Sequence, residues 1–269
     1  MTIRVDFTKP LMRILAVAGL LAIGAIAFAG ASERNRPSGI KGTDDRTRVD
    51  ISDYPWRAIG RINRSGSFCT GVLVAEDEVL TAAHCFWNKR TNRWSQARFF
   101  HFVVGYEKGK YAGTAKGVSY RTAFKSLPDL SDIKLEREDD WAVLKLDKPL
   151  GRKFGVVKIA SGKGRDYLQQ NLKNDVVFQA GYSRDYSHVL TVHKNCQITD
   201  FTKLREKSQP VFLHLCDATR GDSGSPIFVL SNGDYKLIGI HSATAQKTSG
   251  EVVGIAVPSR QFRSAVGDP

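Results

Sequence analysis

Arg220-Gly221-Asp222-Ser223-Gly224-Ser225-Pro226 is the stretch of this 269-residue sequence with the clearest chemical meaning. Glycines on both sides of a serine permit a tight loop whose successive backbone N–H groups point toward one spot. Such a loop can stabilise an anionic tetrahedral intermediate, with the Gly221 and Ser223 amides as donors and the Ser223 hydroxyl as nucleophile. A Gly- and Ser-rich turn is usually only a flexible loop, so this interpretation needs partner residues elsewhere in the chain.

Two upstream motifs supply those partners. Residues 80–85 read Leu-Thr-Ala-Ala-His-Cys, in which small residues let a strand turn sharply and present His84. A histidine titrates near neutrality, so His84 can accept and return a proton. Residues 139–146 read Asp-Asp-Trp-Ala-Val-Leu-Lys-Leu, an acidic pair before a strand. A carboxylate placed there can accept the Nδ1–H of a histidine and fix its tautomer. Each motif alone is weak, but the three together provide nucleophile, base and orienting acid.

In this order the three motifs resemble those of the chymotrypsin-fold (trypsin-like) serine peptidases. The bacterial branch that includes the glutamyl endopeptidases is most similar, because Gly-Asp-Ser-Gly-Ser-Pro replaces the Gly-Asp-Ser-Gly-Gly-Pro of animal enzymes. The resemblance runs from about Ile40 to the C-terminus. It implies a serine endopeptidase that acts through an acyl-enzyme, with His84 as general base, Asp140 as orienting acid and Ser223 as nucleophile. Asp140 is preferred to Asp139 because the family's acid directly precedes the apolar strand.

The fold expected is all-β. From Trp56 onward, short apolar runs of strand length recur between turn signals, without long helical periods. Helix is expected only at a turn around 82–86 and over 259–266. The resemblance implies two packed six-stranded antiparallel β-barrels and a short C-terminal helix. Four segments are expected: an export signal (1–31), a mature N-terminal tail or propeptide (32–50), a first barrel with the histidine and aspartate (51–150), and a second barrel with the serine and substrate pocket (151–269).

The N-terminus has the layout of a cleaved export signal. Arg4, Lys9 and Arg13 precede a 16-residue apolar run, 14–29, which is followed by small residues. The run is shorter than the roughly 20 residues that span a bilayer. We therefore expect a secreted or periplasmic protein with no membrane attachment after cleavage; a retained anchor is the alternative. Removal of 1–31 changes the formal net charge from +13 to +11, since three basic residues and one acidic residue are lost.

Four cysteines in an exported chain are candidates for two disulfides. Pairing in sequence order places one bridge in each half of the chain, and the resemblance implies a first bridge that pins the histidine loop. The alternative is a zinc site of His193, Cys196, His214 and Cys216. An oxidising compartment favours disulfides, so neither a metal nor a cofactor is expected. The four cysteines are Cys69, Cys85, Cys196 and Cys216.

The substrate preference is ambiguous in the sequence. Asp217, six residues before Ser223, lies where trypsin-like enzymes carry the carboxylate that pairs with Arg or Lys of the substrate. His241 lies where glutamyl endopeptidases carry a histidine that helps receive an acidic side chain. Asp217 also follows Cys216 directly and is equally interpretable as a structural residue of the disulfide loop. Ser242, Thr244 and Gly254 complete the pocket that the resemblance implies.

Activation and partners stay open in part. In family members of the zymogen type, a freed N-terminal Ile or Val amine pairs with the acid before the nucleophile, here Asp222, and Ile40 is the candidate. Protein or peptide substrates are the expected partners, and the chain is expected to be a monomer. A catalytically silent binding protein on the same scaffold is one alternative. A basic envelope or nucleic-acid binder is another, but the scattered Lys and Arg residues form no nucleic-acid motif, so no nucleic acid is expected.

Overall fold

The computed structural model describes residues 37–123, 136–162 and 176–267. The expected export signal, 1–31, lies outside these residues, as does part of the expected tail. Contacts divide the chain into one unit of residues 1–38 and a second of 39–269, and all of the strands belong to the second. No helix within the described residues is both long and apolar enough to span a membrane.

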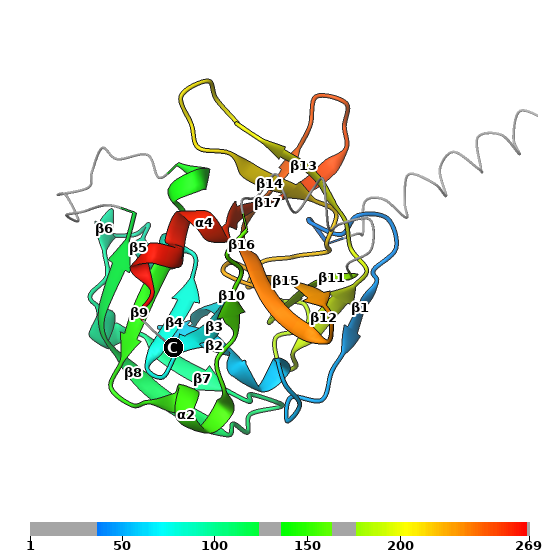
Figure 1. Ribbon diagram of the computed structural model, residues 1–269. Coiled ribbons are helices and arrows are strands. Elements are labelled where there is room, and N and C mark those ends of the chain that lie inside the picture. Colours follow the sequence, from blue (N-terminus) through cyan, green and yellow to red (C-terminus); the bar gives the residue numbers. More distant parts are fainter. Residues whose placement is uncertain (1–36, 124–135, 163–175, 268–269) are drawn as a thin grey trace, which may run out of the picture. The chain divides into compact units, whose positions relative to one another are not determined.

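The first sheet is a closed six-stranded antiparallel barrel with the strand order β2-β3-β4-β9-β8-β7 (Figure 1). Leu, Ile, Val and Phe side chains such as Ile59, Leu80 and Leu144 are fully buried in it. These side chains fill the barrel interior, and β4 is buried along its whole length. The strands are β2 (Ile59–Arg64), β3 (Ser67–Ala75), β4 (Glu78–Thr81), β7 (His101–Val104), β8 (Gly113–Thr122) and β9 (Ala142–Leu146).

The second sheet has nine strands and follows the path β1-β12-β11-β15-β16-β17-β14-β13, with β10 added in parallel to β16. The last strand of the path, β13, follows β12 in the chain after only three residues, where Asn195 has a left-handed φ of 59°. The strands are β1 (Arg46–Arg48), β10 (Lys158–Ile159), β11 (Val176–Gly181), β12 (Thr191–Lys194), β13 (Ile198–Thr202), β14 (Val211–His214), β15 (Pro226–Ser231), β16 (Asp234–Gln246) and β17 (Val252–Pro258).

The all-β prediction is confirmed, but the second sheet differs in detail from a closed six-stranded barrel. It is a curled half-barrel whose strand path does not close: β1 lies at one end of the path and β13 at the other, and β10 pairs with β16 in the middle. β1 comes from the segment expected to be a tail and pairs with β12 in the register Arg46 to His193. Residues 150–162, at the boundary between the two expected barrels, contain α2 (Leu150–Phe154) and β10.

Helical segments are short and lie at strand ends. The expected turn at 82–86 is η2, and the expected C-terminal helix is α4 followed by η6. A two-stranded hairpin, β5 (Trp87–Asn88) and β6 (Arg93–Trp94), follows η2. The helical segments are η1 (Trp56–Ala58), η2 (Ala83–Phe86), η3 (Ala97–Phe99), η4 (Arg137–Asp139), α2 (Leu150–Phe154), α4 (Ser259–Phe262) and η6 (Arg263–Ala265).

Both disulfides are present and pair in sequence order. Cys69 is bonded to Cys85 within the barrel, and Cys196 to Cys216 within the second sheet. The expectation of two disulfides is therefore confirmed. The alternative zinc site loses both of its thiolates, because Cys196 and Cys216 are oxidised.

Candidate active site

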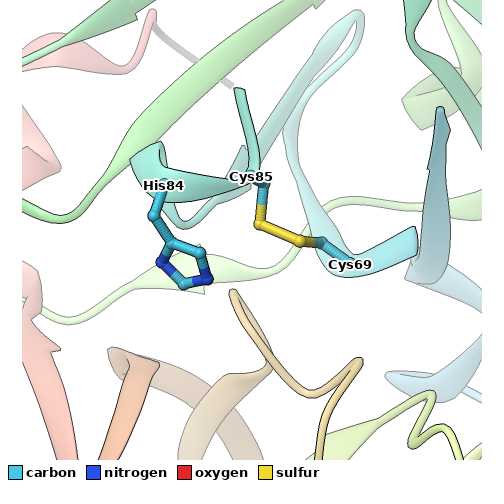
Figure 2. Close-up of side chains that lie close together, drawn as sticks. All are labelled: Cys69, His84 and Cys85. Carbon is cyan, nitrogen blue, oxygen red and sulfur yellow. A yellow bond between two sulfur atoms is a disulfide. The ribbon is translucent and has the colours of Figure 1, made fainter. Parts of the chain in front are cut away.

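The sharp turn after β4 positions His84. β4 ends at Thr81, and Ala82 and Ala83 are fully buried, so that only small side chains fit where the chain enters η2. The next residue, Cys85, is tied to Cys69 of β3, and Figure 2 shows the His84 ring beside this disulfide. The bridge joins the histidine segment to the neighbouring strand β3, which restricts the position of the His84 backbone.

Asp140 holds His84 through two hydrogen bonds. The His84 backbone N–H donates to Asp140 Oδ1 at 2.8 Å, and His84 Nδ1 lies 2.7 Å from Asp140 Oδ2. Asp140 is fully buried at the end of η4. Burial alone would raise its pKa, but the interaction with His84 and the hydrogen bonds from His84 and Ser242 outweigh burial, and the pKa lies below its ordinary value. The carboxylate therefore stays ionised and keeps the proton of a neutral His84 on Nδ1.

Ser242 is the third donor to Asp140, and a β-bulge places it there. In the pairing of β16 with β17, His241 lies opposite Ala256 and Ala243 opposite Ile255, so Ser242 is an extra residue. An extra residue in one strand re-aims its side chain. The Ser242 hydroxyl donates to Asp140 Oδ2 at 2.5 Å and thereby connects the second sheet to the barrel. The hydroxyl of Ser242 thus supports the aspartate, and its expected place in the substrate pocket stays a prediction.

Ser223 faces the other side of the histidine ring, with its Oγ 2.7 Å from His84 Nε2. With Nδ1 protonated, Nε2 is the acceptor for the serine proton. Asp140, His84 and Ser223 therefore form one hydrogen-bonded chain across residues that are far apart in sequence, as the three motifs predicted. This arrangement can deprotonate a serine as it attacks a carbonyl carbon.

The loop around Ser223 leaves two amides free. The N–H groups of Asp222, Gly224 and Ser225 all donate within the protein, to Thr219, His241 and Asp222 carbonyls. By contrast, the Gly221 and Ser223 amides have no acceptor among the residues that the structure describes. Gly221 has φ of 101°, a conformation that L side chains rarely adopt, which explains the need for glycine. Two unsatisfied donors beside a nucleophile can hold an oxyanion.

The Asp217 carboxylate is hydrogen-bonded to the backbone of residues 41–45, near the start of the second unit. It accepts N–H groups of Lys41 at 2.6 Å and Asp45 at 3.1 Å, and lies 3.2 Å from His193 Nδ1. Burial would raise its pKa, but these hydrogen bonds outweigh burial and lower it. Lys41 also reaches the Gly39 and Cys216 carbonyls through its ammonium group. The structural interpretation of Asp217 therefore fits this geometry, and Lys41 is a contributor that the sequence did not reveal.

His241 and His214 form a buried pair behind the nucleophile loop. The Cys216 N–H donates to His214 Nδ1 at 3.2 Å, which leaves the proton of a neutral His214 on Nε2. That nitrogen lies 3.1 Å from His241 Nδ1, so His241 accepts there and carries its own proton on Nε2. His241 is held in place by its backbone, which bonds to Gly224 and Ser225. The chain of hydrogen bonds therefore fixes His241 as a donor at Nε2.

Gly254 makes room for His214. The two residues pair across β14 and β17, and a Cβ added at residue 254 would lie 2.1 Å from the His214 ring. Thr244 is opposite Gly254 on the other side, in β16. We expect Gly254→Ala to lower the stability by about 1–3 kcal/mol through overpacking. This corresponds to roughly 2–4 °C in Tm per kcal/mol for a chain of this size, measured by thermal unfolding.

Gly267→Ala is the matched control, since its Cβ would make only ordinary contacts, the nearest at 3.6 Å from Glu78. Equal Tm values for the Gly254→Ala and Gly267→Ala variants would contradict the packing role of Gly254.

The histidine pair predicts acid sensitivity. Burial lowers the pKa of both residues, to about 3 in His241 from its ordinary 6.5, with neighbouring positive charge adding to the effect. Each is neutral when folded but takes up a proton when unfolded below pH 6.5, so each removes about 1.4 kcal/mol of stability per pH unit. Burial raises the pKa of Asp222 to about 6 from 3.8, which has the opposite effect between these values. The destabilising contribution of the two histidines is larger than the stabilising contribution of Asp222. The free energy of unfolding should therefore fall as the pH is lowered from 6 to 4.

His241→Gln should flatten this dependence, because one remaining histidine then offsets Asp222. Urea unfolding at pH 6, 5 and 4 measures the slope, with the exposed His101→Gln as control. A wild-type stability that rises toward pH 4 would refute the assignment.

The carboxylate of Asp222 is hydrogen-bonded to nearby residues. It accepts hydrogen bonds from the Ser183 and Ser225 hydroxyls and the Thr219 N–H. The Ile40 side chain is buried, with 4% of its surface exposed. A pair between a freed Ile40 amine and Asp222 stays a prediction.

Comparisons with known proteins agree with the fold. The sequence model of the trypsin family matches residues 44–266, and the chain belongs to this family. It is 28% identical over 242 residues to Serine protease 23 of Rattus norvegicus, covering 80% of this chain and 58% of that protein. It is 27% identical over 206 residues to a glutamyl endopeptidase of Bacillus licheniformis, covering 71% and 55% respectively. The chain thus spans somewhat more than half the length of these relatives.

Among solved structures, a Glu endopeptidase described in complex with MPD is similar, with a TM-score of 0.63. The sequences are 20% identical, and the alignment covers 84% of this chain and 98% of the other. This likeness shows the chymotrypsin-like fold.

Proposed function

We propose that the protein is an exported serine endopeptidase that hydrolyses peptide bonds through His84, Asp140 and Ser223. The observation that carries the proposal is the hydrogen-bonded chain of these three side chains next to two unsatisfied amides. Membership of the trypsin family supports it.

The catalytic cycle follows from the positions of the protons. Ser223 Oγ attacks the substrate carbonyl carbon while His84 Nε2 takes the hydroxyl proton, and the Gly221 and Ser223 amides hold the resulting oxyanion. The tetrahedral intermediate collapses as His84 returns the proton to the leaving amine, which breaks the C–N bond and forms the acyl-enzyme. A water molecule then repeats the attack and releases Ser223. Asp140 stabilises the imidazolium in both halves of the cycle.

We further propose an acidic rather than a basic side chain in the primary pocket. Asp217 is occupied by N–H donors, which removes the carboxylate that would pair with Arg or Lys. His241 Nε2 is fixed as a donor, and a carboxylate is the complementary acceptor. Digestion of a peptide library should give cleavage after Glu or Asp, and cleavage after Arg or Lys would contradict this assignment.

Labelling tests the activity itself. An organophosphonate probe should attach to the wild-type protein at Ser223, as identified by mass spectrometry of the digested adduct, because only an activated serine reacts with it. Absence of labelling, together with intact casein after incubation, would refute the proposal.

The N-terminus of the same exported preparation, determined by mass spectrometry, shows where the chain is processed. An N-terminus near residue 32 indicates signal removal, and an N-terminus at Ile40 supports insertion of a freed amine.

A further inference from the structure

We propose that a groove lined by arginine residues, adjoining the catalytic loop, binds acidic residues of the polypeptide substrate on the C-terminal side of the cleaved bond. This inference rests on the proposed peptidase function. His84 must protonate the leaving amine, so the C-terminal part of the substrate departs on the side of the histidine. On that side lie the Cys69–Cys85 bridge (Figure 2) and the turn between β2 and β3 that precedes it.

The groove begins at the oxyanion loop. A hollow of about 100 Å³ is lined by Gly66, Ser67, Phe68, Arg184, Arg220 and Gly221. Since Gly221 supplies one of the two free amides, an occupant of this hollow lies next to the reacting carbonyl. The Arg184 N–H donates to the Arg220 carbonyl at 2.6 Å, which keeps the two arginine segments side by side. Both residues are exposed.

A second, larger hollow of about 870 Å³ continues from the first, because Ser67 lines both. Arg64, Arg90 and Arg93 contribute the positive charge here. The Arg64 guanidinium donates to Ser95 Oγ at 2.7 Å and to the Phe86 carbonyl at 3.5 Å. It thereby holds the β5–β6 hairpin against the turn between β2 and β3 and gives the hollow a fixed wall.

No carboxylate of the described residues compensates the positive charge in the groove. Among the residues with described positions, no Asp or Glu lines either hollow. Arg90, Arg93, Arg184 and Arg220 form no ion pair within 37–123, 136–162 and 176–267, whereas arginines elsewhere, such as Arg46, Arg121, Arg152 and Arg205, are paired with carboxylates. Guanidinium groups bind carboxylates through two parallel hydrogen bonds. A row of five arginines with polar neighbours such as Ser67 and Thr91 is therefore complementary to an acidic peptide.

The position of the groove favours a peptide over another polyanion. A peptide whose carbonyl lies at Ser223 can continue through the first hollow into the second, and its side chains then gain the attraction without a separate docking event. A sulfated polysaccharide or nucleic acid could use the charge but gains nothing from proximity to Gly221.

Matched substrates test the proposal. Two fluorogenic peptides would share the half before the cleaved bond, as defined by the library digest, and carry either four Glu or four Gln after it. Mass spectrometry of the products would identify the cleaved bond, so that only cleavage at the shared site is counted. We expect kcat/KM to be roughly three- to tenfold higher for the Glu peptide, the sum of several exposed charge pairs. The ratio should shrink in 1 M NaCl, since such pairs are screened.

Arg90→Ala/Arg93→Ala and, separately, Arg184→Ala should each lower this ratio. Arg48→Ala/Lys158→Ala, which removes the same charge as the double variant from exposed positions of the second sheet, should leave it unchanged. Equal rates for the two wild-type peptides, or equal losses in the control, would overturn the inference while leaving the peptidase activity established.

A binding measurement tests whether the groove binds acidic peptides even if no peptide is hydrolysed. Fluorescence anisotropy of the labelled Glu and Gln peptides with Ser223→Ala should show tighter binding of the Glu peptide, reduced by the Arg90→Ala/Arg93→Ala changes. Equal affinities would refute the groove as an acidic-peptide site. Displacement of both peptides by heparin, without preference for Glu, would identify a general polyanion site and likewise overturn the proposal.

Discussion

Ser223→Ala should lower kcat by about 10⁶-fold on any cleavable peptide, because the nucleophile, base and acid act as one unit. The hydroxyl oxygen lies 2.7 Å from His84 Nε2, and alanine leaves the base without a proton to accept. The two free amides of the loop are kept, so a residual rate of roughly 10³–10⁴ over water is expected. Steady-state kinetics with a fluorogenic peptide, together with loss of phosphonate labelling, measures the effect.

Further variants separate loss of chemistry from loss of structure. Ser119→Ala, at an exposed position of β8, should retain full activity and labelling. His84→Ala should cost about as much as Ser223→Ala, and the double variant little more than either, since the residues act together. Additive losses would indicate that the two side chains serve separate purposes. A far-ultraviolet spectrum and Tm near those of the wild type would exclude unfolding as the cause.

Asp140→Asn should lower kcat by about 10⁴-fold, the magnitude known for the Ser-His-Asp arrangement. An amide nitrogen facing His84 Nδ1 would favour the tautomer with the proton on Nε2, which then has no lone pair for the Ser223 hydroxyl. The carboxylate also has three donors, the His84 backbone and ring and the Ser242 hydroxyl, and the amide cannot accept from all of them. Comparison of kcat at several pH values with the wild type measures the loss.

Asp139→Asn is the matched control, because the adjacent carboxyl is half-buried and has no part in the hydrogen bonds of His84. It should keep nearly full activity. Ser242→Ala removes only one of the donors to Asp140 and should lie between the two. If Asp139→Asn were the more damaging variant, the assignment of the orienting acid would be wrong.

The hydrogen-bonded arrangement of His84, Asp140 and Ser223 was predictable because each residue lies within a short local motif. Ala82 and Ala83 signal the sharp turn before His84, the strand at 142–146 identifies Asp140, and the glycines around Ser223 signal the loop. These constraints are set by backbone geometry over a few residues, so they can be read without knowledge of distant contacts. The same holds for the C-terminal helix, which follows Pro258.

Features that depend on distant partners were not predictable in this way. The function of Ser242 follows from a bulge that exists only in the pairing with β17. The partners of Asp217 come from a polar segment near residue 41 without any apolar pattern. Strand β8 carries Lys116, Ser119 and Arg121 on its exposed positions, and its pairing with β7 and β9 rather than its hydrophobicity makes it a strand. In each case tertiary pairing outweighs local propensity.

The hydrogen bonds of the proposed active site join two sheets that also share one apolar core. His84 and Asp140 belong to the barrel, and Ser223 and Ser242 to the half-barrel, so the bonds His84–Ser223 and Asp140–Ser242 cross from one to the other. The geometry of the proposed catalytic residues therefore depends on how the two sheets are aligned. A shift of about 1 Å between them is enough to cost about 10²-fold in rate. Inactivation can thus precede any loss of secondary structure, and turnover is a more sensitive reporter of the native arrangement than spectroscopy.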